Sequence, residues 1–235
     1  MPRAPAVTGL LRKRKPWQVI NNMRARENPF RTERLLELSY RFEGTTWDEL
    51  LCRCERLGYR AAIVGPHGSG KTTLIEGLAV QLRSKGYGVE FVRLDEEEPS
   101  FTPGVVSMLA ARLGSNDILL FDGAEQLNPL AWTCFRLRMR RLAGLIVTTH
   151  EPGRLPTLWK CRTSPALLAE IASELLEANP EELRCRARDL FSKHEGNLRD
   201  ALWEWYDLAA EGIIASGRTR LPGSFAPEFR SSVRC

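Results

Sequence analysis

The sequence has no long apolar run and no secretory leader. No apolar stretch approaches the ~20 residues that a helix needs to cross a bilayer. Near the first residue, only the short apolar stretch AVTGLL stands before the basic RKRKP, which is not the pattern of a signal peptide. These absences predict a cytoplasmic protein that makes no contact with membranes.

The sequence also lacks the cysteine spacing of a zinc site or of a disulfide-rich domain. None of its cysteines forms a C-x2-C pair. Cys52 and Cys54 are separated by one residue on an expected helix, where their side chains diverge. We therefore expect reduced thiols in a cytosolic protein, at positions 52, 54, 134, 161, 185 and 235.

The body of the chain has no large charge excess of either sign. The formal net charge is +5, from 34 Lys and Arg against 29 Asp and Glu, and the excess lies near the two ends. A basic run covers residues 12–15, and further arginines occupy the Gly-, Pro- and Ser-rich residues 213–235. Such segments are typical of solvated, flexible chain. The alternative is that they contact the phosphates of a nucleic acid.

The middle of the chain alternates short apolar runs with helical patterns. Strands are expected over residues 61–65, 88–94, 117–122 and 144–149. Helices are expected between them, over residues 72–85, 103–114 and 128–142. This βαβα order predicts an α/β fold, with a mostly parallel sheet sandwiched by helices on both faces.

From Pro165 onward the pattern is only helical. Helices are expected there over 165–177, 180–194 and 197–212, and upstream of the first strand over 28–40 and 46–57. The sequence thus predicts a sheet domain followed by a small helical domain. The expected parts are a flexible basic arm over 1–27, the α/β domain over 28–164, the helical domain over 165–212 and a flexible basic tail over 213–235.

The octapeptide GPHGSGKT, residues 65–72, matches the phosphate-binding P-loop in full. Its glycines let the backbone curl until successive N–H groups point at phosphate oxygens. Lys71 can reach the β- and γ-phosphates, the Thr72 hydroxyl can ligate Mg²⁺, and the helix that starts there turns its positive end toward the anion. The expected nucleotide-binding residues are Gly65, Pro66, His67, Gly68, Ser69, Gly70, Lys71, Thr72 and Thr73.

A carboxylate ends the apolar strand at residues 117–122. Asp122 follows the P-loop at a distance that leaves room for two β/α steps, so it is expected beside the phosphates as a partner of Mg²⁺. Many P-loop ATPases carry a glutamate directly after this aspartate, but here that position is Gly123. Glu125 is the nearest residue able to orient or deprotonate water. The alternative is that Glu125 only lies on a loop and that hydrolysis is slow or absent.

Polar residues also end the next apolar strand, LIVTTH. Thr148, Thr149 and His150 stand where a side chain can contact the γ-phosphate or the attacking water. The neutral imidazole of His150 can act as donor or acceptor. A purely structural histidine is the alternative.

The succession of GPHGSGKT, LLFDGAEQL, LIVTTHEPGRLPTLWKC and HEGNLRDALWEWYD resembles the AAA+ ATPases, most closely their clamp-loader and origin-recognition branches. The resemblance implies that Lys71, Thr72 and Asp122 hold ATP with Mg²⁺, and that Thr149 or His150 is the sensor 1 residue. It also implies that Arg199, in GNLRDAL, reaches the γ-phosphate from a lid helix as sensor 2. The NPF of residues 28–30 resembles the segment that borders the adenine pocket.

Two positions depart from that family. The DGAE sequence with Gly123 is more similar to the signal-transduction NTPases called STAND or NACHT proteins. Lys160 stands where clamp loaders have an arginine finger, and lysine keeps the charge but loses the bidentate fork. Arg162 is close enough in sequence to substitute, so catalysis in trans within a ring stays open.

Three functions remain open at this point. The first is an ATPase whose cycle moves the lid and remodels, loads or regulates a protein or nucleic-acid partner, with a homo-oligomer as another form of partner. The second is a nucleotide-gated switch or adaptor with little hydrolysis. The third, a small-molecule kinase, rests only on the arginines of RLRMRRLAG, whose position favours a solvated or oligomer-facing helix.

Overall fold

The structure is a computed structural model that describes residues 28–30 and 38–211. The predicted basic arm over 1–27, the tail over 213–235 and most of the helix expected over 28–40 lie outside these residues. Where that expected helix is described, at residues 28–30 and 38–40, the chain is not helical.

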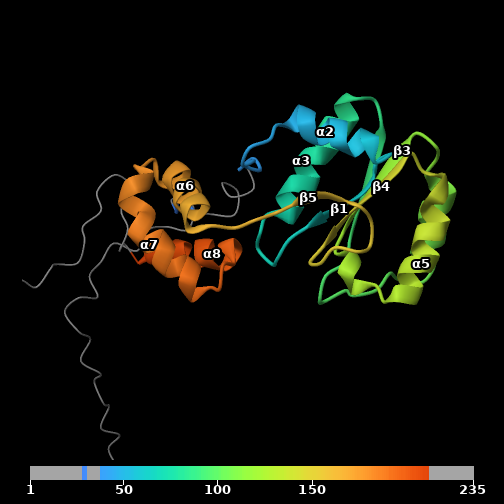
Figure 1. The fold of residues 1–235 in the computed structure, drawn as a ribbon. Coiled ribbons are helices and arrows are strands. Elements are labelled where there is room, and N and C mark those ends of the chain that lie inside the picture. Colours follow the sequence, from blue (N-terminus) through green and yellow to red (C-terminus); the bar gives the residue numbers. More distant parts are fainter. Residues whose placement is uncertain (1–27, 31–37, 212–235) are drawn as a thin grey trace, which may run out of the picture.

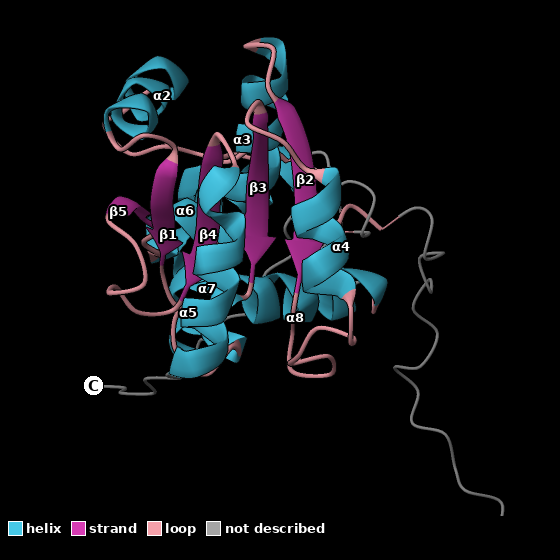
Figure 2. Cartoon of the chain, turned by 90° about the vertical axis from the view of Figure 1, so that its right-hand side faces the viewer, coloured by secondary structure: helices cyan, strands magenta, loops and turns pink. Residues whose placement is uncertain are grey.

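A five-stranded parallel sheet forms the core of the α/β part of the chain (Figure 1). Its strands run in the order β2-β3-β4-β1-β5 (Figure 2). The four strands expected from the sequence are all present. The fifth, β5, was not expected: it is only four residues long and pairs with β1 through a shift in register. The strands are β1 (Arg60–Val64), β2 (Gly88–Arg93), β3 (Asp117–Asp122), β4 (Gly144–Thr149) and β5 (Thr157–Lys160).

The inner strands are mostly apolar because helices cover both faces of the sheet. All six residues of β4 are buried, and five of the six in β3. Side chains alternate between the faces: Ile118 and Leu120 of β3 pack into one apolar cluster, Leu119 and Phe121 into another.

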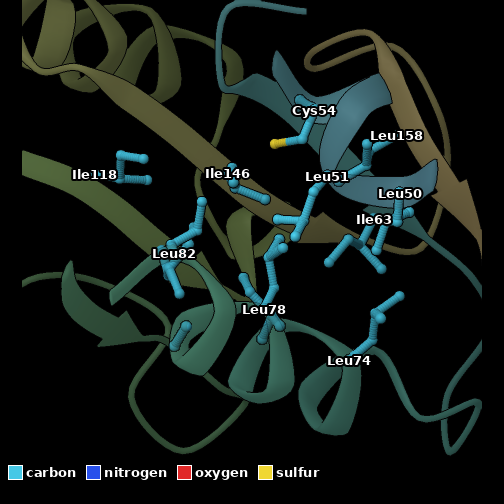
Figure 3. Close-up of a cluster of buried hydrophobic side chains, with 14 of the residues drawn as sticks. Leu50, Leu51, Cys54, Ile63, Leu74, Leu78, Leu82, Ile118, Ile146 and Leu158 are labelled. Carbon is cyan, nitrogen blue, oxygen red and sulfur yellow. The ribbon is translucent and has the colours of Figure 1, made fainter. Parts of the chain in front are cut away.

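Helices α2 (Trp47–Arg56) and α3 (Lys71–Ser84) cover one face. Figure 3 shows Leu50, Leu51 and Cys54 of α2 among the side chains that α3 and the strands contribute to this cluster. Thr46 and Glu49 form a capping box that sets the start of α2. The opposite face is covered by α4 (Val105–Arg112), α5 (Pro129–Arg138) and the short 3₁₀ helix η3 (Met139–Arg141) (Figure 2).

The chain then forms α6 (Pro165–Leu176), α7 (Pro180–Lys193) and α8 (Leu198–Ala210), close to the predicted ranges. These helices have an apolar cluster of their own, which includes the fully buried Trp205. The Phe30 ring stacks on Trp205 at 5.8 Å between centroids, and Asn28 Nδ2 donates to the Tyr206 carbonyl. The first described residues therefore pack against α8, away from the sheet.

Two further features bear on the expectations above. No helix within residues 28–30 and 38–211 is long and apolar enough to span a membrane. The cysteines in that part of the chain, at positions 52, 54, 134, 161 and 185, are free thiols, and Cys235 lies outside it.

Candidate nucleotide-binding site

The P-loop connects the end of β1 to the start of α3, as the sequence predicted. Gly68 and Gly70 adopt φ values of +65° and +82°, which side chains of L-residues rarely adopt. At Gly65 a Cβ would lie 2.6 Å from Ser69 Oγ and 2.9 Å from Cys161 Cβ, so no side chain fits there. Ser69 Oγ donates to the Pro66 carbonyl at 2.8 Å and ties the loop to itself. Gly68 and Gly70 are thus needed for the backbone conformation of the loop, and Gly65 for its close packing against Ser69 and Cys161.

Lys71 lies under this loop with only 9 % of its surface exposed. Its Nζ donates to the carbonyls of Gly65 and Pro66, each at 2.8 Å. Burial lowers the pKa of Lys71, while the nearby negative charge of Glu125 opposes that shift. The ammonium group is therefore held by neutral acceptors, which a charged phosphate oxygen could replace with a stronger hydrogen bond.

Asp122 is the centre of a polar cluster at the carboxyl end of the sheet. The Thr72 hydroxyl donates to Asp122 Oδ2 at 2.9 Å, and the Thr148 hydroxyl donates to Oδ1 at 2.6 Å. Strand β4 lies between β1 and β3, so Thr148 bridges the two strands that carry the P-loop and Asp122. A phosphate-binding loop and a strand-end aspartate are joined here by a direct hydrogen bond. This is the fold of a P-loop nucleoside triphosphatase.

The threonines that end β4 have different contacts. The Gly123 amide donates to Thr148 Oγ1 at 2.8 Å, so Thr148 holds both Asp122 and the turn after it. The Thr149 hydroxyl instead donates to the Glu151 carbonyl at 2.7 Å. Thr148 is therefore the threonine in contact with Asp122, and a contact of Thr149 or His150 with the γ-phosphate stays a prediction. Thr73, also named there, lies half-buried in the first turn of α3.

The donor atoms at this point suit Mg²⁺. Thr72 Oγ1 and Asp122 Oδ2 are hard oxygen ligands, which Mg²⁺ prefers, and they already lie within hydrogen-bond distance of each other. Both residues were named as metal ligands from the sequence. Their proximity is therefore compatible with that role.

Arg93 is a member of this cluster that the sequence analysis missed. Its Nε and Nη2 each lie 3.0 Å from Asp122 Oδ2, and its Nη2 lies 3.8 Å from Glu76 Oε1. Arg93 ends β2 and Asp122 ends β3, and they are direct partners in the register of these parallel strands. Each residue is the last of its strand, so the Arg93–Asp122 pair could have been predicted if β2 and β3 were known to be neighbours. The sequence alone does not give that strand order.

Gly123 cannot carry a side chain in this structure. Its φ is +89°, and a Cβ there would lie 2.0 Å from the backbone oxygen of Leu94. A glutamate, which many P-loop ATPases carry at this position, therefore does not fit here. The chain turns at Gly123 into the 3₁₀ helix η2 (Ala124–Gln126), which contains Glu125.

Glu125 lies close to the P-loop lysine and to His150. Its Oε1 is 3.1 Å from His150 Nε2, and its Oε2 is buried without a hydrogen-bond partner among the described residues. Its charge is also the largest electrostatic influence on the pKa of Lys71, after burial. Arg154 holds the following loop, because its guanidinium donates to the Leu127 carbonyl and lies 5.3 Å from the Trp132 ring centroid.

The rings of the two histidines of the site are in contact, with their planes tilted by 58°. The ring centroids of His67, in the P-loop, and His150, after β4, are 3.8 Å apart. Burial lowers the pKa of His150 more than the charge of Glu125 raises it. A lowered pKa favours the neutral imidazole of His150, whose Nε2 faces Glu125.

The amino end of α8 packs directly on the tip of the P-loop. A Cβ on Gly68 would lie 1.7 Å from Asn197 Oδ1 and 3.1 Å from the Arg199 amide nitrogen. Asn197 caps α8 by accepting from the amides of Arg199 and Asp200. The Arg199 side chain is exposed, yet its charge lowers the pKa of Lys71. The structure thus brings Arg199 near the P-loop and adds Asn197, which the sequence did not single out.

Lys160 lies on the other side of the P-loop strand. It is the last residue of β5 and pairs with Val64, whereas Asp122 lies beyond β4. The exposed Lys160 lines a pocket together with Tyr40, Arg53 and Arg162. Within the described residues no side-chain hydrogen bond joins it to the P-loop, so the structure does not bring Lys160 together with the other candidates.

Comparisons with known proteins give short or distant matches. No family model matches the chain. The GPN-loop GTPase 2 proteins of Xenopus tropicalis and Xenopus laevis are 29 % identical to it over 119 and 109 residues, which cover 46 % and 42 % of this chain. The matched parts span only 39 % and 34 % of those proteins.

Two solved structures of point mutants of Thermotoga maritima RuvB align with 71 % and 70 % of the chain. The alignments cover 72 % and 70 % of the RuvB chains, with TM-scores of 0.42 and 0.41 and sequence identities of 15 % and 18 %. The classification as a P-loop NTPase fold therefore rests on the loop, the sheet order and the Asp122 cluster described above.

Proposed function

We propose that this chain is a Mg²⁺-dependent nucleoside triphosphatase whose nucleotide is ATP. The observation that carries the proposal is the convergence of Lys71, the hydrogen-bonded pair Thr72–Asp122 and Glu125 at one end of the sheet. Each supplies a group that phosphoryl transfer to water requires: a cation, ligands for the metal and a base.

The phosphates would bind on the P-loop amides and at the amino end of α3. Lys71 Nζ would leave the carbonyls of Gly65 and Pro66 for the β- and γ-phosphate oxygens. Thr72 and Asp122 would hold Mg²⁺, which when bound neutralises phosphate charge. These roles use contacts that already converge on the loop.

Glu125 is the proposed base for the attacking water. Its Oε2 is buried and lacks a hydrogen-bond partner among the described residues, so this oxygen is available to accept a proton. The neutral His150 would hold the other oxygen, Oε1, and so orient the carboxylate. This arrangement takes the place of the glutamate that Gly123 excludes.

A switch with little hydrolysis is the second candidate, and one observation favours it. Glu125 reaches the site from the 3₁₀ turn after Gly123 and is already paired with His150. A base that is held by another side chain is a weaker base for water. In that case ATP binding rather than turnover would carry the signal.

The lid would transmit the state of the nucleotide to a partner. Asn197 and the backbone of α8 already contact Gly68, so phosphate on the P-loop would bear directly on α8. Arg199 would contact the γ-phosphate and be released after hydrolysis. The load would be a protein, a nucleic acid or further copies of this chain, which the helical part would remodel, load or regulate.

ATP is proposed because the motifs resemble those of AAA+ ATPases, whereas GTP is the alternative that the GPN-loop GTPase relatives suggest. Equilibrium binding of fluorescent ATP and GTP analogues, each with and without Mg²⁺, separates these nucleotides. We expect tighter binding of the ATP analogue and its loss in Lys71→Ala.

Turnover separates the two functions. If the chain is an ATPase, Glu125→Gln should reduce steady-state phosphate release by roughly 10²-fold or more while nucleotide binding is kept. A robust rate that Glu125→Gln leaves unchanged would overturn the assignment of the base. A wild-type rate already near zero, with tight binding, would support the switch instead.

A further inference from the structure

The carboxylate proposed to bind Mg²⁺ is already paired with a cation of the protein. Asp122 Oδ2 accepts from the Thr72 hydroxyl and lies 3.0 Å from both Nε and Nη2 of Arg93. A carboxylate oxygen offers about two lone-pair directions, so these donors leave none free on Oδ2. The other oxygen, Oδ1, is taken by Thr148 at 2.6 Å. A metal ion can therefore reach Asp122 only if a donor leaves.

Arg93 is the donor that must leave. The Thr72 hydroxyl can keep its hydrogen bond to Asp122 and still offer an oxygen lone pair to a metal. Arg93 cannot, because its guanidinium accepts no hydrogen bonds and carries a permanent positive charge that repels a divalent cation on the same oxygen. Mg²⁺ and Arg93 are thus alternative partners of Oδ2.

A second acceptor for Arg93 lies next to the first. Glu76, on α3, has its Oε1 3.8 Å from Arg93 Nη2. The side chain of Asp122 is only 10 % exposed, whereas those of Glu76 and Arg93 are 52 % and 46 % exposed. Arg93 therefore needs only a small side-chain movement, outward along the surface, to exchange a buried partner for a solvated one.

We propose that Arg93 is a built-in counterion of Asp122, which Mg²⁺ displaces toward Glu76 when nucleotide binds. This inference rests on the proposed function and adds a device to it. In the absence of metal Arg93 neutralises the buried carboxylate, which is costly to leave unpaired. In the presence of metal and nucleotide Glu76 holds the released arginine. The exchange sets how much Mg²⁺ the site requires, and it links the end of β2 to the state of the nucleotide.

The Mg²⁺ dependence of nucleotide binding tests the exchange. ADP binding would be titrated calorimetrically over a range of Mg²⁺ concentrations for wild type, Arg93→Gln, Glu76→Gln and the double variant. Arg93→Gln should lower the Mg²⁺ concentration for half-maximal effect by roughly fivefold, because its competitor is gone. Glu76→Gln should raise this Mg²⁺ concentration, because it removes the second carboxylate that would accept Arg93. The matched control is Arg112→Gln, which breaks a surface pair with Glu90 away from the cluster and should change nothing.

The double variant separates displacement from general electrostatics. If Glu76 acts by receiving Arg93, Glu76→Gln has no effect once Arg93 is Gln. If Arg93 and Glu76 influence Mg²⁺ only through long-range electrostatics, the effects of Arg93→Gln and Glu76→Gln on the Mg²⁺ requirement add. Arginine side-chain NMR gives a readout that does not involve turnover: the Arg93 Nε–H signal, assigned from its absence in Arg93→Lys, should shift when Mg²⁺ and ADP are added together.

The outcomes are distinct. If ADP binds normally but the effects of Arg93→Gln and Glu76→Gln on the Mg²⁺ requirement add, the displacement is overturned and the proposed function stands. The same holds if Arg93→Gln needs as much Mg²⁺ as wild type. An Arg93 signal that Mg²⁺ and ADP leave unmoved also overturns the displacement. A wild-type protein that binds neither ADP nor GDP overturns the proposed function and the displacement with it.

Discussion

Single residues at this site are constrained by backbone shape as much as by chemistry. Gly123 follows Asp122 at the end of β3, and the Leu94 backbone leaves it no room for a Cβ. Since the acid has no place at that position, Glu125 from the next turn supplies the carboxylate near Lys71. The turn that excludes a glutamate at position 123 is thus the same turn that brings Glu125 toward Lys71.

Gly123→Ala should be strongly destabilising. The new Cβ meets a backbone atom at 2.0 Å and the residue must keep a φ near +89°, so we expect a loss of roughly 2–4 kcal/mol in the free energy of unfolding. Gly86→Ala is the matched control, because Gly86 has a φ of +88° but nothing within 4 Å of its Cβ position. Urea denaturation of both variants measures the difference. Equal losses would show that φ alone, and not the contact with Leu94, is limiting.

His150 should make the stability of the protein depend on pH. Burial lowers the pKa of His150 in the folded state, so the unfolded chain takes up a proton more readily. Stability from this group is present above the usual histidine pKa of about 6.5 and is lost as the pH falls through it. His150→Gln should therefore show a flatter decline in unfolding free energy between pH 7 and pH 5 than wild type. Parallel declines would contradict this cause.

At the scale of elements, the P-loop and α8 form one contact although they lie about 130 positions apart in the sequence. Asn197 Oδ1 is fixed by the amides of Arg199 and Asp200, so it cannot easily move away from Gly68. The helix cap is therefore also the surface on which the P-loop rests.

Gly68→Ala should push α8 away from the loop. Its Cβ would lie 1.7 Å from Asn197 Oδ1, and we expect a loss of roughly 1–3 kcal/mol of stability. Asn197→Gly removes the obstructing atom, and glycine is itself a tolerated N-cap that costs only a few tenths of a kcal/mol. The double variant should recover part of the loss in a urea denaturation cycle. Strictly additive effects would mean that the two residues do not press on each other.

At the scale of the whole molecule, the helical part contacts the sheet part through α6 and α8. Arg41 pairs with Glu170 and Glu174 of α6, and the amino end of α8 meets Gly68 of the P-loop. A change at the P-loop can therefore be passed to α6–α8 through contacts that already exist. Their movement relative to the sheet is the output that the proposed cycle would use.

Arg199→Ala should impair the response to nucleotide more than folding. The side chain is exposed, so its loss should change stability by less than about 0.5 kcal/mol. Limited proteolysis or tryptophan fluorescence with ATP, ADP and no nucleotide would report movement of the helical part. Arg188→Ala, at an exposed arginine of α7, is the control and should respond as wild type does. An unchanged response in Arg199→Ala would reduce Arg199 to a solvated surface residue.

Much of the fold could be predicted from local patterns. The P-loop, the strand ending in Asp122 and the three helices after Pro165 each carry their signal within a short window. Strand β5 was missed because it has only four residues, after a loop that contains proline, and because it is held by pairing with β1. Periodicity does not register so short a strand.

The local sequence of this chain was enough to single out the P-loop, Asp122 and Glu125 as candidate groups of a nucleotide site, because glycine spacing, apolar periodicity and strand-end carboxylates act over a few residues. The tertiary structure decided which of these groups meet. That Thr148 rather than Thr149 contacts Asp122, that Arg93 pairs with the same carboxylate and that Asn197 packs on Gly68 depends on strand order, register and helix placement. Those are set by packing between residues far apart in the chain, which no short stretch of sequence encodes.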